Sequence, residues 1–339
     1  MADNRILCVL LTALCCTGSP NGLTAEEPSL NPFDFRSALG IGQGEIVFNY
    51  TLGGRQFWGD VQCFHDWRIQ RNVFTGHYRL LDGSDRRHAS GTLEVCREKL
   101  AQIRKTSQLP PMSGRAVILL HGIFRSSHAM RWIGDQVVGD DALPLSLDYP
   151  STQISISAAA EYVDSVVSQL DGIDQIDFVC HSLGGLVLRA YLAEHADPRI
   201  RRIVMIGTPN QGAEMADLLQ GFWLYRGLFG PAGRELNRDP EGIIPKLPVP
   251  PMEFAVIAGA RGVPDGWNLL IPGDDDGTVT VASTRLVGAA DFVTVPVLHS
   301  FLISDPQVAE MTDRFLREGR LRADGNPEPI VEIQSVEDR

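Results

Sequence analysis

The 339-residue sequence is poor in cysteine, in basic residues and in long apolar runs. It has six cysteines, and no pair of them has the spacing of a zinc site. Its 30 basic and 42 acidic residues give a net charge of −12, which argues against binding of nucleic acid or of anionic membranes through overall charge. The apolar run at residues 6–16 is too short to span a bilayer. What remains is a globular chain, 44% hydrophobic, that can bury a large core in one large domain or two smaller ones.

The N-terminus has a weakly basic start followed by that short apolar run. This pattern is typical of a signal peptide within residues 1–25, and it predicts an exported protein, whether periplasmic, secreted or envelope-associated. A hydrophobic N-terminal segment that stays uncleaved is the alternative. In an exported chain Cys63 and Cys96 could form a disulfide, and Cys180 would remain a free, buried thiol.

Residues 36–110 form a β-rich N-terminal region with one helix, according to their pattern. Aromatic, β-prone runs separated by turn signals such as Gly53-Gly54 predict a small antiparallel sheet. The apolar spacing over residues 92–105 predicts a helix. The sequence does not indicate what this region does.

Residues 113–318 alternate between short apolar runs and amphipathic helical patterns. This alternation predicts an α/β fold, a mostly parallel sheet with helices on both faces. The predicted strands are residues 116–120, 143–147, 176–180, 203–206, 254–258 and 292–297, and the predicted helices are residues 127–138, 157–170, 183–195 and 308–318. Residues 213–251 form a long insertion, and residues 319–339 are predicted to be a mobile, mostly acidic tail.

A serine stands where one predicted strand turns abruptly into a helix. The apolar run that ends at Cys180 is followed by His181, Ser182 and two glycines, and then by an amphipathic helical pattern. Small neighbours allow a sharp strand-to-helix turn to lift a hydroxyl clear of the backbone. The helix N-terminus would place the N–H of Leu183 beside that hydroxyl, which suits an oxyanion. A serine that merely caps a helix is the alternative.

A serine hydroxyl needs a base to become a nucleophile, and the base needs an acid to orient it. His299 follows the last predicted strand, on the sheet edge where open α/β proteins build their sites. An acidic loop follows the strand at residues 254–258, and its three carboxylates are candidates for the acid: Asp274, Asp275 and Asp276. An acidic surface loop or a calcium-binding turn is the alternative for this loop.

Together these segments resemble the α/β-hydrolase superfamily, in its lipase and esterase branch. The resemblance covers about two-thirds of the chain, from Arg115 to Arg317. It is carried by the elbow Cys180-His181-Ser182-Leu183-Gly184, by His121-Gly122, by Asp276-Gly277 and by His299, in the chain order Ser, Asp, His that this fold uses. One residue departs from the pattern, because Cys180 stands where the elbow usually has its first glycine.

The resemblance implies roles for these residues. Ser182 would be the nucleophile, His299 the base and Asp276 the acid, since the acid in lipase-like relatives often directly precedes a glycine. Asp274 and Asp275 remain alternatives. The oxyanion would be held by the N–H groups of Leu183 and of Ile123, the residue after the His-Gly pair, with Phe124 as the alternative.

The activity that the resemblance implies is cleavage of a carboxylic ester, either a small molecule or a lipid, without cofactor or metal. The insertion at residues 213–251 lies where the family carries a lid, which leaves transient contact with a lipid surface open. Acyl transfer or thioester hydrolysis by the same residues is one alternative. A non-catalytic hydrolase fold that binds a lipid or a protein is another. The oligomeric state is not predicted.

Overall fold

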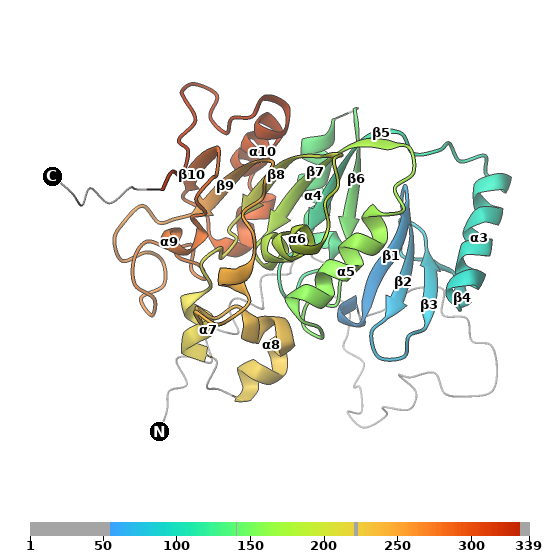
Figure 1. Cartoon of the computed structure of the whole chain (residues 1–339), viewed down its shortest axis with the longest axis horizontal. Coiled ribbons are helices and arrows are strands. Elements are labelled where there is room, and N and C mark those ends of the chain that lie inside the picture. Colours follow the sequence, from blue (N-terminus) through green and yellow to red (C-terminus); the bar gives the residue numbers. More distant parts are fainter. Residues whose placement is uncertain (1–54, 140, 220–222, 333–339) are drawn as a thin grey trace, which may run out of the picture. The chain divides into compact units, whose positions relative to one another are not determined.

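The computed structural model describes residues 55–139, 141–219 and 223–332 (Figure 1). The predicted signal segment and the β-prone run at residues 45–50 lie outside the described residues, so export stays a prediction. In the described part the strands form two sheets, one of six strands and one of four. None of the helices in these ranges combines the length and the apolar character that crossing a membrane requires.

The six-stranded sheet carries the fold. Its strands are β5 (Gly114–Leu120), β6 (Ala142–Leu147), β7 (Ile173–His181), β8 (Ile200–Ile206), β9 (Glu253–Gly259) and β10 (Asp291–Val295). They lie in the order β10-β9-β8-β7-β5-β6, and every neighbouring pair is parallel. The central strands are almost wholly buried, as their continuous apolar runs predict. The predicted α/β fold is therefore confirmed.

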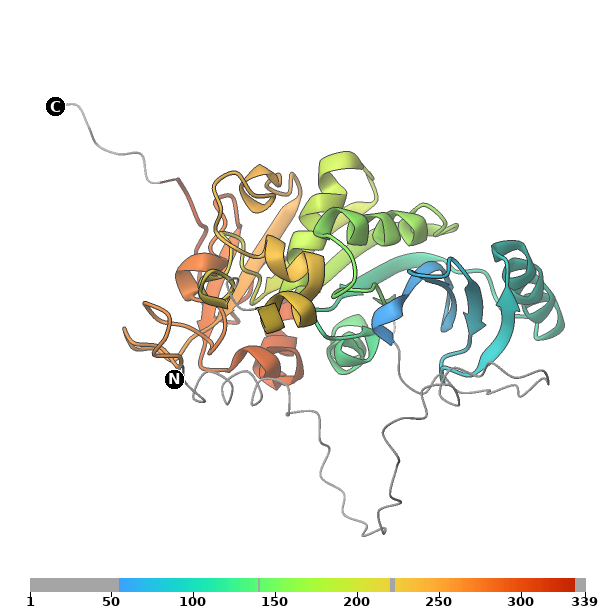
Figure 2. The same ribbon diagram turned by 90° about the horizontal axis from the view of Figure 1, so that it is seen from below.

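Helices cover both faces of this sheet (Figure 2). On one face α5 (Ile156–Val167) packs against α6 (Leu183–Glu194), and on the other α4 (Ser127–Val138) packs against α10 (Pro306–Glu318). The ends of α10 follow local chemistry: the Asp305 side chain accepts from two first-turn N–H groups, and Gly319 ends the helix in a left-handed conformation.

The N-terminal sheet is an antiparallel meander, also as predicted. It contains β1 (Trp58–Phe64), β2 (Trp67–Asn72), β3 (Tyr78–Leu81) and β4 (Arg87–Gly91), preceded by the short 3₁₀ helix η1 (Arg55–Phe57) and followed by α3 (Leu93–Thr106). It packs through β1 onto α5. A Cβ at Gly59 would overlap the Tyr162 ring, so only a glycine allows so close an approach. The sequence missed β4, because its polar residues show no apolar alternation.

The disulfide considered for Cys63 and Cys96 is not formed. Both are free thiols, Cys63 buried in β1 and Cys96 buried in α3. They behave as small apolar side chains, and burial raises the pKa of Cys96 to about 11. A protonated thiol is a poor nucleophile for exchange chemistry.

The insertion between β8 and β9 is partly helical. It contains α7 (Glu214–Leu219), α8 (Trp223–Glu235) and the 3₁₀ helix η2 (Ile244–Lys246). Arg189 of α6 fixes its end: the buried guanidinium donates to the carbonyls of Leu247, at 2.7 Å, and Pro248, at 3.0 Å. Whether the insertion moves as a lid stays a prediction.

The tail predicted to be mobile is packed against the fold over residues 319–332, and residues 333–339 lie outside the described residues. Leu321 is fully buried. The carboxylate of Asp291, at the start of β10, accepts from the N–H groups of Leu321, at 2.7 Å, and Glu328, at 2.9 Å. Arg322 pairs with the same carboxylate. One apolar anchor and one buried carboxylate thus hold a segment whose own composition is polar.

Candidate active site

Ser182 lies at the turn between β7 and α6. Its backbone has φ 53° and ψ −122°, a conformation that a residue with a side chain adopts only under strain of about 1–3 kcal/mol. The turn is held by the Ser182 N–H, which donates to the Ile206 carbonyl of β8 at 2.9 Å. This geometry places the hydroxyl at the carboxyl edge of the sheet, where open α/β sheets build their sites.

The two glycines after the elbow are required by packing. A Cβ at Gly184 would overlap the Leu120 carbonyl oxygen, and one at Gly185 would lie 2.6 Å from Thr208 Cγ2. The small Cys180 side chain is fully buried, and burial raises the pKa of its thiol well above the ordinary value. Cys180 therefore acts as a compact apolar residue where the family usually has glycine.

The structure brings His299 onto Ser182. His299 begins the short 3₁₀ helix η3 (His299–Ser304), just beyond β10. Its Nε2 lies 3.0 Å from Ser182 Oγ, which is hydrogen-bonding distance. Its backbone N–H donates to the Asp276 carbonyl at 2.9 Å, so the loop of the acid also fixes the position of the base.

Among the three adjacent aspartates, Asp276 is the one that contacts His299. Its Oδ2 lies 2.7 Å from His299 Nδ1. Its Oδ1 accepts from the N–H groups of Thr278, at 3.0 Å, and Val279, at 2.7 Å. Because the carboxylate is buried and held at both oxygens, it can orient the imidazole with Nε2 facing the serine.

The neighbouring carboxylates shape the loop. Asp274 accepts from the N–H groups of Arg261 and Gly262. Asp275 is buried and accepts from the N–H of Gly277 at 2.6 Å, while desolvation raises its pKa. The alternatives that the sequence leaves open are thus separated by tertiary contacts.

The His-Gly loop, residues 121–126, lies against the nucleophile. A Cβ at Gly122 would stand 3.0 Å from Ser182 Cβ. Phe124 has a positive φ of 59°, and its ring meets the Phe229 ring of α8 with centroids 4.6 Å apart. Within the described residues the N–H groups of Leu183, Ile123 and Phe124 donate to no protein acceptor. Both loop residues therefore remain candidates for the second oxyanion donor.

Two glycines outside the predicted catalytic residues make room for the His299 and Asp276 side chains. A Cβ at Gly207, where φ is 58°, would lie 3.2 Å from His299 Nδ1. A Cβ at Gly259, the last residue of β9, would lie 2.5 Å from Asp276 Cβ. Gly207 begins a Gly-Thr-Pro turn directly after β8, whereas no motif in the sequence marks Gly259.

His181 lies between the base and the His-Gly loop. Its Nε2 is 3.2 Å from the His299 carbonyl, and the two rings are 4.9 Å apart. Burial, followed by the nearby charges of His299 and Arg125, lowers its pKa well below the ordinary value, so the ring stays neutral. The sequence analysis assigns His181 no role beyond its place in the elbow motif.

A serine hydroxyl thus lies within hydrogen-bonding distance of an imidazole, which in turn contacts a buried carboxylate. Such an arrangement can turn a hydroxyl into a nucleophile. Over residues 55–139, 141–219 and 223–332, no group of three or more His, Cys, Asp or Glu side chains is placed to hold a metal ion. The chemistry that the described side chains support is nucleophilic attack by serine.

Several known proteins are similar to parts of this chain. A family model described as a domain of unknown function, DUF7379, matches residues 94–220, which include the elbow and the His-Gly loop. The mature lipase BlEst2 of Bacillus licheniformis is 21% identical, over 61% of this chain and 93% of that chain, with a TM-score of 0.47. Phospholipase PlaB from Legionella pneumophila is 14% identical, over 60% and 59% of the two chains, with a TM-score of 0.47. Aspergillus fumigatus lipase B is 14% identical, over 64% and 54%, with a TM-score of 0.44. A comparison with curated protein sequences gives no match.

The parallel sheet, the serine elbow between β7 and α6, and the chain order of Ser182, Asp276 and His299 define the architecture without reference to these similarities. The chain has the α/β-hydrolase fold.

Proposed function

We propose that this protein hydrolyses carboxylic esters, with Ser182 as nucleophile, His299 as general base and acid, and Asp276 as the residue that orients His299. The observation that carries the proposal is the continuous contact from Ser182 Oγ to His299 Nε2, at 3.0 Å, and from His299 Nδ1 to Asp276 Oδ2, at 2.7 Å. These contacts join residues from three separate loops at one edge of the sheet, an arrangement that a simple helix cap does not need.

The first half of the reaction forms an acyl-enzyme. Ser182 Oγ attacks the ester carbonyl carbon while His299 Nε2 takes the hydroxyl proton. The C=O bond becomes a C–O⁻ bond, and the electron pair returns when the bond to the leaving alcohol breaks. His299 gives its proton to the departing alkoxide oxygen. Ser182 is left esterified to the acyl group.

The second half releases the acyl group. Water takes the place of the alcohol, His299 removes its proton, and the hydroxide oxygen attacks the acyl carbon. Collapse of this second tetrahedral intermediate breaks the bond to Ser182 Oγ, which recovers a proton from His299. The products are a carboxylic acid and the free enzyme.

The negative oxygen in both intermediates needs donors that stand in place before the reaction. The N–H of Leu183, at the N-terminus of α6, supplies one, and the N–H of Ile123 or Phe124 supplies the other. A single donor of this kind is worth about 10²–10³-fold in kcat. Gly122 allows the His-Gly loop to approach Ser182 closely enough for this role.

The proposal is tested by the hydrolysis of p-nitrophenyl esters from acetate to palmitate. Ser182→Ala should lower kcat by about 10⁴-fold or more and abolish labelling by a fluorophosphonate probe. Ser165→Ala, on α5, changes a serine whose hydroxyl only bonds the Glu161 carbonyl, and it should keep full activity.

Folded wild-type protein that neither cleaves any ester nor reacts with the probe would contradict the proposal. If the wild-type protein is active, the dependence of kcat/KM on acyl length distinguishes a short-chain esterase from a lipase. A maximum of kcat/KM at acyl chains of roughly eight or more carbons would favour a lipid ester as substrate.

A further inference from the structure

The N-terminal sheet, whose role the sequence does not indicate, touches the loops beside the nucleophile through one glutamine. Gln56 lies in η1, directly before β1. Its Nε2 donates to the Arg125 carbonyl of the His-Gly loop at 2.7 Å. Its Oε1 accepts from the hydroxyls of Ser151, at 3.0 Å, and Thr152, at 3.3 Å, in the turn after β6. One side chain thus joins two loops at the carboxyl edge of the sheet.

A second connection runs through the residues after β6. The ring of Tyr149 stacks on that of His121, with centroids 4.2 Å apart and planes 7° apart, and its hydroxyl donates to the His121 carbonyl. Both side chains are buried, so this contact fixes the base of the His-Gly loop. The His121 ring is also fixed by its own loop, since its Nδ1 lies 2.8 Å from the Gly122 carbonyl oxygen.

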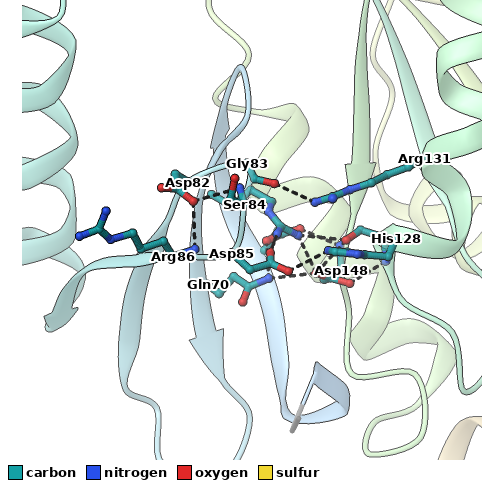
Figure 3. A network of polar contacts seen from close by, with 12 residues as sticks. Gln70, Asp82, Gly83, Ser84, Asp85, Arg86, His128, Arg131 and Asp148 are labelled. Atoms are coloured by element: carbon teal, nitrogen blue, oxygen red, sulfur yellow. Dashed lines mark hydrogen bonds and ion pairs between the residues drawn. The ribbon is translucent and has the colours of Figure 1, made fainter. Parts of the chain in front are cut away.

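β1 holds the residue before Tyr149 in place. The N–H of Asp60 donates to the Asp148 carbonyl at 2.8 Å, and the N–H of Asp148 donates to the Asp60 carboxylate at 2.6 Å. Asp148 also accepts from Arg68 at 2.7 Å and from Gln70 at 3.1 Å, both on β2. Figure 3 shows part of this polar network, in which Gln70 of β2 and Asp148 lie close together.

The His-Gly loop that these contacts hold is also restricted in its backbone conformation. It is a tight turn, closed by the Arg125 N–H on the Gly122 carbonyl at 3.2 Å, and it contains Phe124 at a positive φ. The Arg125 carbonyl belongs to the same turn as the N–H groups of Ile123 and Phe124. A donor that fixes this carbonyl therefore also fixes the direction in which those N–H groups point.

We infer that the N-terminal sheet is the scaffold of the oxyanion-binding loop, and that Gln56 is a positioning residue that acts through the Arg125 carbonyl. The inference rests on the proposed function, because it assigns the His-Gly loop its role in ester hydrolysis. Among the described residues Gln56 makes no hydrogen bond to Ser182 or His299. Its effect should appear in the tetrahedral intermediates and not in the binding of the substrate.

The test compares Gln56→Ala with Gln169→Ala. Gln169, two residues after α5, is also a half-buried glutamine that joins the N-terminal sheet to the rest of the fold, since it donates to the Val61 carbonyl of β1 at 2.7 Å. It lies outside the His-Gly loop, so it controls for the loss of a glutamine at the same interface. Gln56→Glu is the conservative variant: it keeps the acceptor oxygens but cannot donate to Arg125.

The Gln56→Ala and Gln56→Glu variants should both lower kcat for p-nitrophenyl esters by about 10–100-fold with KM unchanged, while Gln169→Ala stays within about twofold. An alkyl boronic acid, which forms a tetrahedral adduct on serine, should bind the Gln56 variants more weakly by the same factor as kcat falls. A purely structural role would lower the melting temperature without this parallel change.

Hydrogen exchange gives a readout that does not depend on activity. The amides of residues 123–125 should exchange faster in Gln56→Ala than in Gln169→Ala and wild type. If wild-type protein lacks esterase activity but the exchange difference appears, the proposed function fails and the scaffold role stands. If kcat and exchange in Gln56→Ala match those of Gln169→Ala, the inference is overturned, whatever the wild-type activity.

Discussion

Replacement of Gly259 by alanine tests whether the contact between acid and base limits the reaction. Gly259 ends β9, and its backbone conformation does not require glycine. A Cβ there would lie 2.5 Å from Asp276 Cβ and would overlap the Val297 carbonyl oxygen. Ordinary carbon contacts are about 3.5–4.0 Å, so the Asp276 side chain must shift by about 1 Å. The 2.7 Å contact between Asp276 Oδ2 and His299 Nδ1 cannot survive such a shift unchanged.

A misplacement of about 1 Å typically costs about 10²-fold in rate, which corresponds to about 2.7 kcal/mol in the activation free energy. Overpacking should also lower the free energy of unfolding by about 1–3 kcal/mol. The assay is kcat on a p-nitrophenyl ester, with the melting temperature measured on the same preparation. The double variant Gly259→Ala/Asp276→Asn should be hardly slower than Asp276→Asn alone, because both changes damage the same contact.

Gly134→Ala is the matched control. It lies in α4, and its Cβ would stand 3.3 Å from the flexible end of Leu119, which can give way. The gain in helix propensity, about 1 kcal/mol, should offset that crowding, so both activity and stability should stay near those of the wild type. A folded Gly259→Ala variant with kcat within threefold of wild type would refute the steric reasoning about Asp276.

Three further outcomes follow from buried charged groups. Desolvation raises the pKa of Asp60 to about 7, so between its ordinary value near 4 and pH 7 the folded state binds the extra proton. The free energy of unfolding should therefore fall as pH rises through that window and level off above it, and urea unfolding of Asp60→Asn should lack this part of the slope. Arg189→Met leaves the carbonyls of Leu247, Pro248 and Asn210 without their donor and should cost about 3 kcal/mol, measured by urea unfolding, whereas Arg189→Lys should recover part of the loss. The Leu321 amide should be protected from hydrogen exchange by its bond to Asp291, and exchange at the rate of an unstructured peptide would show the tail to be mobile after all.

Much of the fold is encoded in local sequence patterns. The helix predicted at residues 127–138 is α4 with the same bounds, because its apolar residues recur with the helical period and pack on the sheet. Strands such as β5 and β7 are recognisable from their continuous apolar runs. β4 escaped prediction because its residues, Arg-His-Ala-Ser-Gly, are held by pairing with β3 and not by a buried face of their own. The tail at residues 319–332 escaped because its main partner, Asp291, lies on a distant strand.

The sequence by itself determined the kind of site, since a serine elbow, an acidic loop and a histidine after the last strand stand in the order of one fold. Tertiary structure decided the rest. Three adjacent carboxylates are equivalent in sequence, and only the folded loop turns Asp276 toward His299 while the Asp275 carboxylate accepts from the Gly277 N–H. Gly259 and Gln56 carry no motif, because their importance comes from atoms that they approach across the fold. Helices and strands follow from the periodicity of neighbouring residues, whereas the direction of a side chain in a loop depends on partners that are far away in the chain.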